Sequence, residues 1–335
     1  MKAKQILKKV LVIVIGIMMV LSLAACSKSA EPEKEEAKEE AAEEEAEAEE
    51  AEAAEESDEA KAAAYNKILA ELKANAPAAP EGTLTVAMSP DFAPMEFVDL
   101  ARSGDEQYVG FDVLLSNYIA NELGMALEIK PMSFDATQAA VQTGSVDLGI
   151  SGFSWTEERA KNYFITDWYE AGDNETQQVV ITTAENEGKF ATAEDFAGLK
   201  IGAQGASLQK VLVEAQLADA ELMLYENLND AVTSLLTGKI DVLAVAHGNG
   251  EAFIAANEGK LAFSGFEFEV DEMYKNNVIL MNKNNEELGQ KVNEVLAKLK
   301  TEDNAVLWYE ACQMLAEIKT LDELGYDDDG NKIEE

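Results

Sequence analysis

Positive charge and cysteine are both scarce in this sequence of 335 residues. It has 26 lysines and arginines against 65 acidic residues, one histidine and two cysteines, and its formal net charge is −39. A chain this acidic lacks the basic surface that binds phosphates, which excludes a nucleic-acid partner. Only two of the cations are arginines, Arg102 and Arg159. Because the arginine side chain ends in a planar fork that suits carboxylates, these two positions are the first candidates for a binding role.

The two cysteines, Cys26 and Cys312, are expected to have different roles. Cys26 follows four lysines, an apolar run of about 14 to 16 residues and the small residues Ala24 and Ala25. Such a run is shorter than the roughly 20 residues of a membrane-spanning helix, so residues 1–25 are interpreted as a signal peptide rather than a transmembrane anchor. Leu-Ala-Ala-Cys resembles the lipobox of bacterial lipoproteins, which implies lipid attachment at Cys26. Cys312 is then left without a disulfide partner and is expected to be a buried, inert thiol.

Residues 31–60 contain almost nothing that a core could bury. They hold 17 acids and two lysines, and glutamates repeat four residues apart, where like charges destabilise a helix. We therefore expect a solvated acidic tether. Apolar residues then recur at helical spacing and predict a short amphipathic helix before Pro77: Tyr65, Ile68, Leu69 and Leu72.

After Pro80 the sequence alternates between strand-like and helix-like segments. Strands are expected over 83–88, 127–130 and 147–151, because these are short runs rich in β-branched and apolar residues. Helices are expected over 112–123 and 135–142, which are amphipathic and stop at glycine. This alternation predicts an α/β fold in which helices flank parallel or mixed β-sheets.

Two segments of this body share the same order of signals. Residues 135–148 and 230–242 each contain an Asp that begins a helix, a Thr-Gly stop, an Asp and then a strand. Chance recurrence of a common helix-glycine-strand unit is one explanation. The other is a pair of similar lobes with a cleft between them, where ligand sites tend to occur.

Three segments carry residues that suit the wall of such a cleft. Residues 89–97 form a loop with two prolines around Phe92, and residues 151–159 end in a short helix that bears Arg159. Residues 201–209 pass from a strand through a glycine turn into a helix, whose free N–H groups attract anions. Together these features describe a carboxylate-binding pocket with an aromatic wall.

An ordered set of motifs in the body resembles a known family, although each motif alone is weak. The motifs cover residues 110–113, 143–152, 156–160, 164–169, 199–202 and 237–241. From about Gly82 to Leu321 the chain resembles the extracellular solute-binding proteins that deliver polar amino acids to ABC importers. The resemblance implies the type II periplasmic-binding fold, with two similar lobes, each a mixed β-sheet flanked by helices, joined by two hinge strands across a ligand cleft.

Domain boundaries follow from composition and from this resemblance. Residues 1–25 are the signal peptide, 26–60 the acidic tether, 61–80 the short helix and linker, and 325–335 an acidic tail. The first lobe is expected over 81–175 and again over 271–324, and the second lobe over 176–270. Hinges are expected near 173–180 and 270–278, with C-terminal helices from Glu286 to Ile318 packed on the first lobe.

The resemblance also implies roles for individual residues. Arg159 would hold the ligand carboxylate, with Ser154 beside it and Ser207 closing from the other lobe. Ser151 and the Gly152 carbonyl would face the ligand amino group. Phe92 would stack on the ligand side chain and Phe153 would lie nearby, although a core position is an alternative for both rings. For Arg159 the alternative is a surface salt bridge to Glu157 or Asp167, and Arg102 is expected to be solvated in a polar turn.

The sequence departs from the family pattern at the ammonium site. Members that bind α-amino acids usually carry an Asp eight residues after the glycine of the Gly-Lys/Arg-x-Asp motif, and that position here is Ala246, followed by His247. His247 is equally open to a ligand contact and to a structural role. Either another acid binds the ammonium, or the ligand lacks an ordinary α-ammonium group. The candidate acids are Asp91, Glu96, Asp173 and Glu175.

The expected function is capture of a small carboxylate-bearing solute, an amino acid or a derivative, by a monomeric lipoprotein on the outer face of the bacterial cytoplasmic membrane. Its partners would be the permease and ATPase of an ABC importer. No cofactor, metal or catalytic residue is expected. Two alternatives stay open: a dehydratase-like enzyme on the same scaffold, with Glu96 or Glu175 as the acid, and a ligand-sensing surface receptor.

Overall fold

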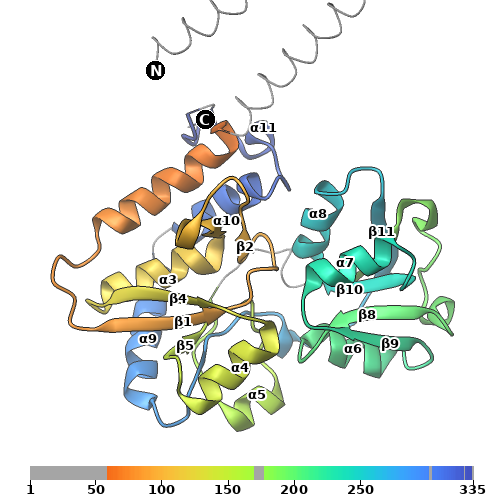
Figure 1. The fold of residues 1–335 in the computed structure, drawn as a ribbon, viewed down its shortest axis with the longest axis horizontal. Coiled ribbons are helices and arrows are strands. Elements are labelled where there is room, and N and C mark those ends of the chain that lie inside the picture. The colour runs from red at the N-terminus through yellow and green to blue at the C-terminus, as the bar shows by residue number, and fades with distance from the viewer. Residues whose placement is uncertain (1–58, 170–176, 302–303, 328, 334–335) are drawn as a thin grey trace, which may run out of the picture. The chain divides into compact units, whose positions relative to one another are not determined.

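The computed structural model describes residues 59–169, 177–301, 304–327 and 329–333 (Figure 1). Cys26, the signal peptide and nearly all of the tether therefore lie outside the described residues. Two five-stranded sheets form separate lobes, and helices cover both faces of each sheet. The predicted α/β fold with two mixed sheets is confirmed. None of the described helices is long and apolar enough to cross a membrane.

The first sheet has the strand order β4-β1-β5-β12-β6. Strand β1 pairs in parallel with β4 and with the central strand β5, while β12 pairs antiparallel with β5 and β6. The strands are β1 (Thr83–Met88), β4 (Ala126–Pro131), β5 (Leu148–Gly149), β6 (Phe164–Ile165) and β12 (Leu280–Met281). A separate short hairpin of β2 (Phe97–Val98) and β3 (Tyr108–Val109) comes between β1 and β4 in the sequence.

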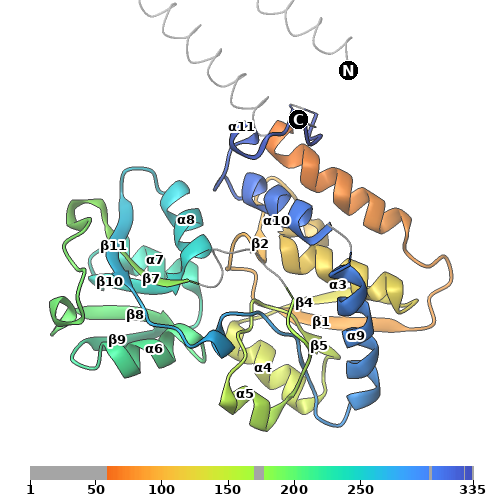
Figure 2. The same cartoon turned by 180° about the vertical axis from the view of Figure 1, so that it is seen from behind.

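Two sets of helices cover the faces of this sheet. The helix over 59–74 packs into one core with α3 (Phe111–Glu122), α9 (Glu286–Leu299) and α10 (Asn304–Leu315). The opposite core contains α4 (Phe134–Thr143), and α5 (Glu157–Asn162) follows it on this side. The short α11 (Leu321–Leu324) comes next to the helix over 59–74, so both ends of the described chain lie on the first lobe (Figures 1 and 2).

The second sheet has the order β11-β7-β10-β8-β9. Strand β7 pairs antiparallel with β10 and β11, and β8 pairs in parallel with β10 and β9. The strands are β7 (Gln178–Thr183), β8 (Lys200–Gln204), β9 (Glu221–Tyr225), β10 (Val242–Ala246) and β11 (Leu261–Glu267). Helices α7 (Leu228–Leu236) and α8 (His247–Ala255) pack on one face and α6 (Leu208–Gln216) on the other.

The repeated signals of the sequence form equivalent elements in the two lobes. Helix α4 ends at Gly144 and α7 stops before Gly238, and both glycines have φ near +70°, a conformation that favours glycine. Each glycine leads into an inner strand, β5 or β10. The expected strand over 147–151 is only two residues long as β5, because Ile150 and the residues after it leave the sheet to form the loop that carries the site.

The chain crosses between the lobes twice. On the first crossing, the described residues of the first lobe end at Tyr169 and those of the second begin at Gln177, so half of the expected hinge over 173–180 lies outside the described residues, and Gln178 to Val180 belong to β7. The return crossing follows β11 and contains a short 3-10 helix over Glu272–Tyr274 (Figure 2). Trp155 of the first lobe stacks on Tyr274, with ring centroids 6.3 Å apart, so this crossing packs against the first lobe.

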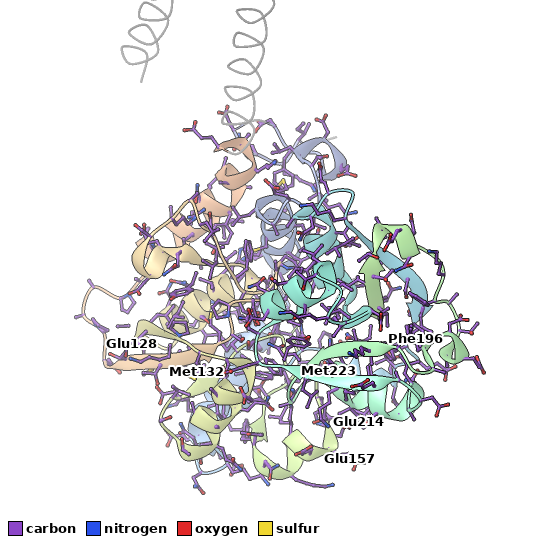
Figure 3. All side chains as sticks on the ribbon, turned by 45° about the vertical axis from the view of Figure 1, so that its right-hand side comes forward. Glu128, Met132, Glu157, Phe196, Glu214 and Met223 are labelled. Carbon is purple, nitrogen blue, oxygen red and sulfur yellow. The ribbon has the colours of Figure 1, made fainter. Side chains whose placement is uncertain are left out.

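The acidic excess of the body is found on the surface of both lobes. Glu128 and Glu157 of the first lobe and Glu214 of the second are exposed, as Figure 3 shows. Each is paired with a nearby lysine, at 2.5, 3.6 and 2.7 Å respectively. Exposed pairs of this kind contribute little to stability, so the surface charge concerns solubility more than the fold.

Candidate functional site

A small pocket lies between the two lobes, where the strands of both sheets end. The remaining space is about 20 Å³, enough for about one water molecule. Seven of the nine predicted site residues line it: Phe92, Ser151, Gly152, Ser154, Arg159, Ser207 and Ala246. Their roles in ligand binding stay predictions, but the fold brings these distant segments together.

Arg159 spans the gap between the lobes. It lies in α5, whose first turn is capped by the Thr156 hydroxyl, and its side chain is buried, with 4% of the residue exposed. Nη1 donates to the Ser154 carbonyl at 2.6 Å, and Nη2 donates across the gap to the Ala206 carbonyl at 3.0 Å. Nε donates to Gln138 Oε1 at 3.3 Å. Neutral oxygens thus accept all three contacts of this cation.

Two aromatic rings support the Arg159 guanidinium. It lies 5.0 Å from the ring centre of Phe153 and 5.6 Å from that of Phe134. Burial lowers the pKa of Arg159 to about 10, so the group stays charged at neutral pH. Among the described residues no carboxylate forms an ion pair with it, and Glu157 pairs with Lys161 instead. The alternative of a surface salt bridge to Glu157 or Asp167 is therefore wrong.

Two buried carboxyl groups lie behind the floor of the pocket. Ser151 donates its hydroxyl to Glu96 Oε1 at 2.6 Å and accepts from the Ser89 N–H at 3.0 Å. The Gly152 N–H donates to Asp112 Oδ2 at 2.9 Å, and the Tyr169 hydroxyl donates to Asp112 Oδ1 at 2.9 Å. The residues that form the floor are thus held from behind by hydrogen bonds to acids.

These two acids are unusual because both are fully buried. Burial raises the pKa of Asp112 to about 6, against the lowering effect of its hydrogen bonds to Gly152 and Tyr169. Burial and the neighbouring Asp112 charge raise the pKa of Glu96 well above its usual range. A protonated Glu96 beside an ionised Asp112 is the arrangement that these shifts favour at neutral pH.

The second lobe contributes neutral groups to the pocket. Ser207 caps α6 by accepting from the Lys210 N–H at 3.1 Å, and it donates to the Gln204 carbonyl at 2.7 Å. This confirms the predicted helix start after the glycine turn. Ala206, just before the cap, has φ of 58°, which is uncommon outside glycine, and its carbonyl accepts from Arg159. Gln209 donates to Gln178 Oε1 at 2.6 Å.

Asp91 links the lobes beside the pocket and does not line it. Its Oδ2 accepts from Gln204 Nε2 at 3.0 Å and from the Leu228 N–H at 2.8 Å, both in the second lobe. Its Oδ1 accepts from the Ser89 hydroxyl at 2.9 Å. Both carboxylate oxygens are engaged in these contacts, so Asp91 is placed to hold the lobes together.

Two predicted site residues do not line the pocket. Phe153 is fully buried in the core under α4, next to Phe134 at 4.8 Å between ring centroids. It therefore meets the site only through the face it turns to Arg159. His247 begins α8, and its ring stacks on Phe263 with centroids 4.8 Å apart. Its Nδ1 lies 3.7 Å from Glu251 Oε2.

The pocket wall contains further residues that sequence reasoning missed. Gln204 and Gln209 belong to the segment 201–209, in which the sequence predicts a glycine turn and a site role for Ser207 but no role for the two glutamines. Gln178 follows the first crossing, and Asn277 forms isolated bridges with Ser154 and Tyr169 where the chain returns. No local pattern marks these two positions. The missed residues of the wall are Phe134, Gln178, Gln204, Leu208, Gln209 and Asn277.

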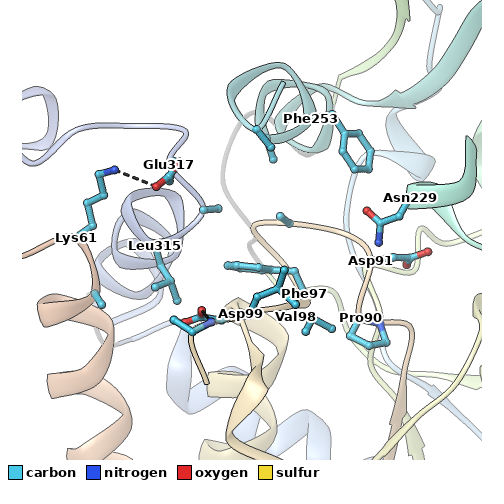
Figure 4. Close-up of a pocket in the computed structure, with 17 residues that line it drawn as sticks. Lys61, Pro90, Asp91, Phe97, Val98, Asp99, Asn229, Phe253, Leu315 and Glu317 are labelled. Atoms are coloured by element: carbon cyan, nitrogen blue, oxygen red, sulfur yellow. Dashed lines mark hydrogen bonds and ion pairs between the residues drawn. The ribbon is translucent and has the colours of Figure 1, made fainter. Parts of the chain in front are cut away.

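A larger cavity of about 690 Å³ lies elsewhere between the lobes (Figure 4). Phe97 and Leu315 of the first lobe face Phe253 of the second across it, and Lys61 is paired with Glu317 at its edge. It contains none of the nine predicted site residues. The cation of the small pocket, Arg159, has neutral acceptors, whereas the cation of the large cavity, Lys61, is paired with a carboxylate. In the described part of the chain no cluster of histidine, cysteine or acidic side chains is arranged to hold a metal ion.

This arrangement is that of a two-lobed protein with a buried arginine between the lobes. The family model of bacterial extracellular solute-binding proteins, family 3, matches residues 84–309. The chain belongs to this family.

Known members provide the closer comparison. A probable histidine-binding protein of Campylobacter jejuni is 28% identical over 204 residues, covering 59% of this chain and 75% of that protein. The amino acid ABC transporter substrate-binding protein AbpA from Streptococcus pneumoniae, bound to L-arginine, is 30% identical with a TM-score of 0.63, over 72% of this chain and 98% of that one. An ancestral arginine-binding protein bound to glutamine is 29% identical with a TM-score of 0.62, over 69% and 98% of the two chains.

Proposed function

We propose that this protein captures a small carboxylate-bearing solute, an amino acid or a derivative, and delivers it to the permease and ATPase of an ABC importer. Relatives named as amino-acid-binding proteins of such transporters support this role. We further propose that it acts as a monomer, lipid-anchored through Cys26 on the outer face of the bacterial cytoplasmic membrane. The lipobox-like residues before Cys26 support the anchor, and the acidic tether would separate the lobes from the membrane.

The observation that carries the proposal is that the buried Arg159 has only neutral acceptors among the described residues. A buried guanidinium is normally paired with a carboxylate, because desolvation of an unpaired charge is costly. Here its acceptors are the carbonyl oxygens of Ser154 and Ala206 and the amide oxygen of Gln138. A ligand carboxylate would replace these neutral acceptors with a bidentate charged partner, which is a stronger interaction.

Binding requires the two lobes to separate and close again. The space of about 20 Å³ is too small for any amino acid. The hydrogen bonds that cross the gap among the described residues are few: Arg159 and Gln138 donate to the Ala206 carbonyl, Gln204 and the Leu228 N–H donate to Asp91, and Asn249 donates to the Ala93 carbonyl. Such contacts can be exchanged for contacts with a ligand during hinge closure.

We propose that the protein binds its solute without catalysing a reaction. The dehydratase-like alternative needs a carboxyl group that touches the ligand, and Glu96 was one of its two candidates. Glu96 lies behind Ser151 and does not line the pocket. The other candidate, Glu175, lies outside the described residues.

A substitution at each of the two arginines tests the assigned site. In Arg159→Ala, we expect the affinity for carboxylate solutes to fall by about 30-fold or more, because a buried charged contact is lost. The measurement is the ligand-induced rise in unfolding temperature of the full chain, with affinity from titration calorimetry. Arg102→Ala is the matched control, because Arg102 pairs with Asp99 at 2.6 Å and lies away from the pocket. A full temperature shift in Arg159→Ala would refute the site.

A further inference from the structure

The described wall of the pocket carries a single formal charge, which is positive. Arg159 is the cation, and the other polar groups are neutral hydroxyl and amide side chains: Ser151, Ser154, Ser207, Gln178, Gln204, Gln209 and Asn277. An α-amino acid brings an ammonium as well as a carboxylate. Arg159 suits the carboxylate, but a buried ammonium without a carboxylate partner is costly, because its lost hydration is not replaced.

Ala246 provides a second indication of the same kind. It ends β10 with 1% exposure, lines the pocket, and stands at the start of α8. Its methyl group supplies no acceptor for the first-turn N–H groups of this helix. An aspartate here would cap the helix and pair with an ammonium, whereas alanine leaves the positive end of the helix dipole at this wall. That field favours a hydrogen-bond acceptor on the ligand over a cation.

The charged groups next to Ala246 do not replace the missing carboxylate. His247 turns its ring onto Phe263, and Glu251, one turn further along α8, lies 3.7 Å from its Nδ1. Neither side chain is part of the pocket wall.

The two described candidate acids of the first lobe also face away from the wall. Both oxygens of Asp91 accept hydrogen bonds from Ser89, Gln204 and Leu228. Glu96 lies behind Ser151, and burial next to Asp112 keeps its pKa raised, so it is neutral where an ammonium would need a charge. The Asp112 carboxylate is itself compensated by the Gly152 N–H and the Tyr169 hydroxyl.

We infer that the solute is a carboxylate whose α-substituent is uncharged, such as a 2-oxo, 2-hydroxy or N-acyl acid. This inference rests on the proposed function and narrows its ligand. Arg159 binds the carboxylate, while the amide side chains and the start of α8 bind a neutral oxygen in the place of the ammonium. The solute therefore differs in charge from the arginine found in the solved relatives.

Matched solutes test this directly on the full chain. L-Leucine is compared with 4-methyl-2-oxopentanoate and N-acetyl-L-leucine, L-alanine with pyruvate, and L-glutamine with N-acetyl-L-glutamine. L-Arginine and L-histidine are measured as well. We expect at least one counterpart without the ammonium to bind at least about 30-fold more tightly than its amino acid, as expected for an unpaired buried charge. An amino acid that binds as tightly as its counterpart, or more tightly, overturns the inference but leaves the proposed function standing.

A substitution at Ala246 provides the second arm. Ala246→Asp adds the missing carboxylate, so the preference should reverse toward the α-amino acid by a similar factor. Ala246→Asn is the control, since it has nearly the same shape without the charge and should not reverse the preference. A preference that is the same in Ala246→Asp as in the parent chain overturns the inference. Failure of every solute in both classes to bind the parent chain refutes the proposed function itself.

Discussion

The first lobe contributes to the pocket a buried arginine and a floor held from behind by two acids, whereas the polar side chains that the second lobe contributes are neutral serine and glutamine. On the first lobe, Ser151 and Gly152 are fixed by Glu96 and Asp112. On the second, Ser207 is fixed by the first turn of α6. The first wall is thus the preorganised and charged half, and the second wall is the neutral half of the proposed site.

Glycine substitutions at the pocket should give the largest difference in stability between the two lobes. Gly152 has φ of +53°, and a Cβ there would lie 2.8 Å from Cε1 of Phe92. Gly152→Ala should therefore strain the floor and displace Phe92, lowering the free energy of unfolding by about 3 kcal/mol and weakening ligand binding. Chemical denaturation and calorimetric titration measure the two effects.

Gly205, which lies in the turn between Gln204 and Ser207 of the second wall, is the matched control for this change. A Cβ there would meet only the Tyr225 carbonyl, at an ordinary 3.7 Å. Gly205→Ala should change the stability by less than about 1 kcal/mol. Equal losses in the two variants would contradict the distinction between a rigid first wall and an adaptable second wall.

The serines of the two walls should differ by a smaller amount. Ser151→Ala leaves Glu96 Oε1 without its donor and the Ser89 N–H without its acceptor, both buried, and should cost about 2 kcal/mol. Ser207→Ala removes a helix cap and should cost about 1 kcal/mol. The measurement is urea unfolding of both variants under the same conditions. A larger loss in Ser207→Ala would reverse the assignment of the rigid wall.

The sequence predicts elements well where a local signal sets both ends. The strand Thr83–Met88 is found as expected, because an apolar run between Gly82 and Pro90 defines it. The helix expected over 112–123 is Phe111–Glu122, because an apolar run and the stop at Gly124 define it. Strand β5 is shorter than expected, since its end depends on pairing with β12, which comes from a segment about 130 residues later. Pairing over that distance leaves no trace in the local pattern.

The same limit applies to the site. Arg159 is conspicuous because arginine is rare in this chain, and small polar residues at strand ends mark Ser151 and Ser207. Phe153 does not line the pocket because its side chain points toward α4 and into the core. The sequence around it does not reveal this direction. Gln178 and Asn277 reach the pocket only because the chain crosses between the lobes there. The charge of the wall could therefore be determined only from the fold.

The smallest predicted effect depends on pH and distinguishes the buried acids of the first wall from surface acids. Glu96 has a raised pKa in the folded state, so the folded protein holds a proton that the unfolded chain releases above about pH 4.5. Its stabilising contribution is complete below that pH and is lost as the pH rises through the raised folded pKa. Glu96→Gln mimics the protonated acid, because its amide accepts from Ser151 and donates toward Asp112.

The free energy of unfolding of Glu96→Gln relative to the parent chain should therefore increase with pH above about 4.5. Urea unfolding at a series of pH values measures this difference. Glu106→Gln is the control: Glu106 is exposed, and its hydrogen bond to Lys73 lowers its pKa, so its contribution is present at neutral pH and lost on acidification. The two variants should thus differ in the sign of their pH dependence. Parallel pH curves for both would mean that Glu96 is ionised like a surface acid and that the floor of the first wall is not held by a neutral carboxyl group.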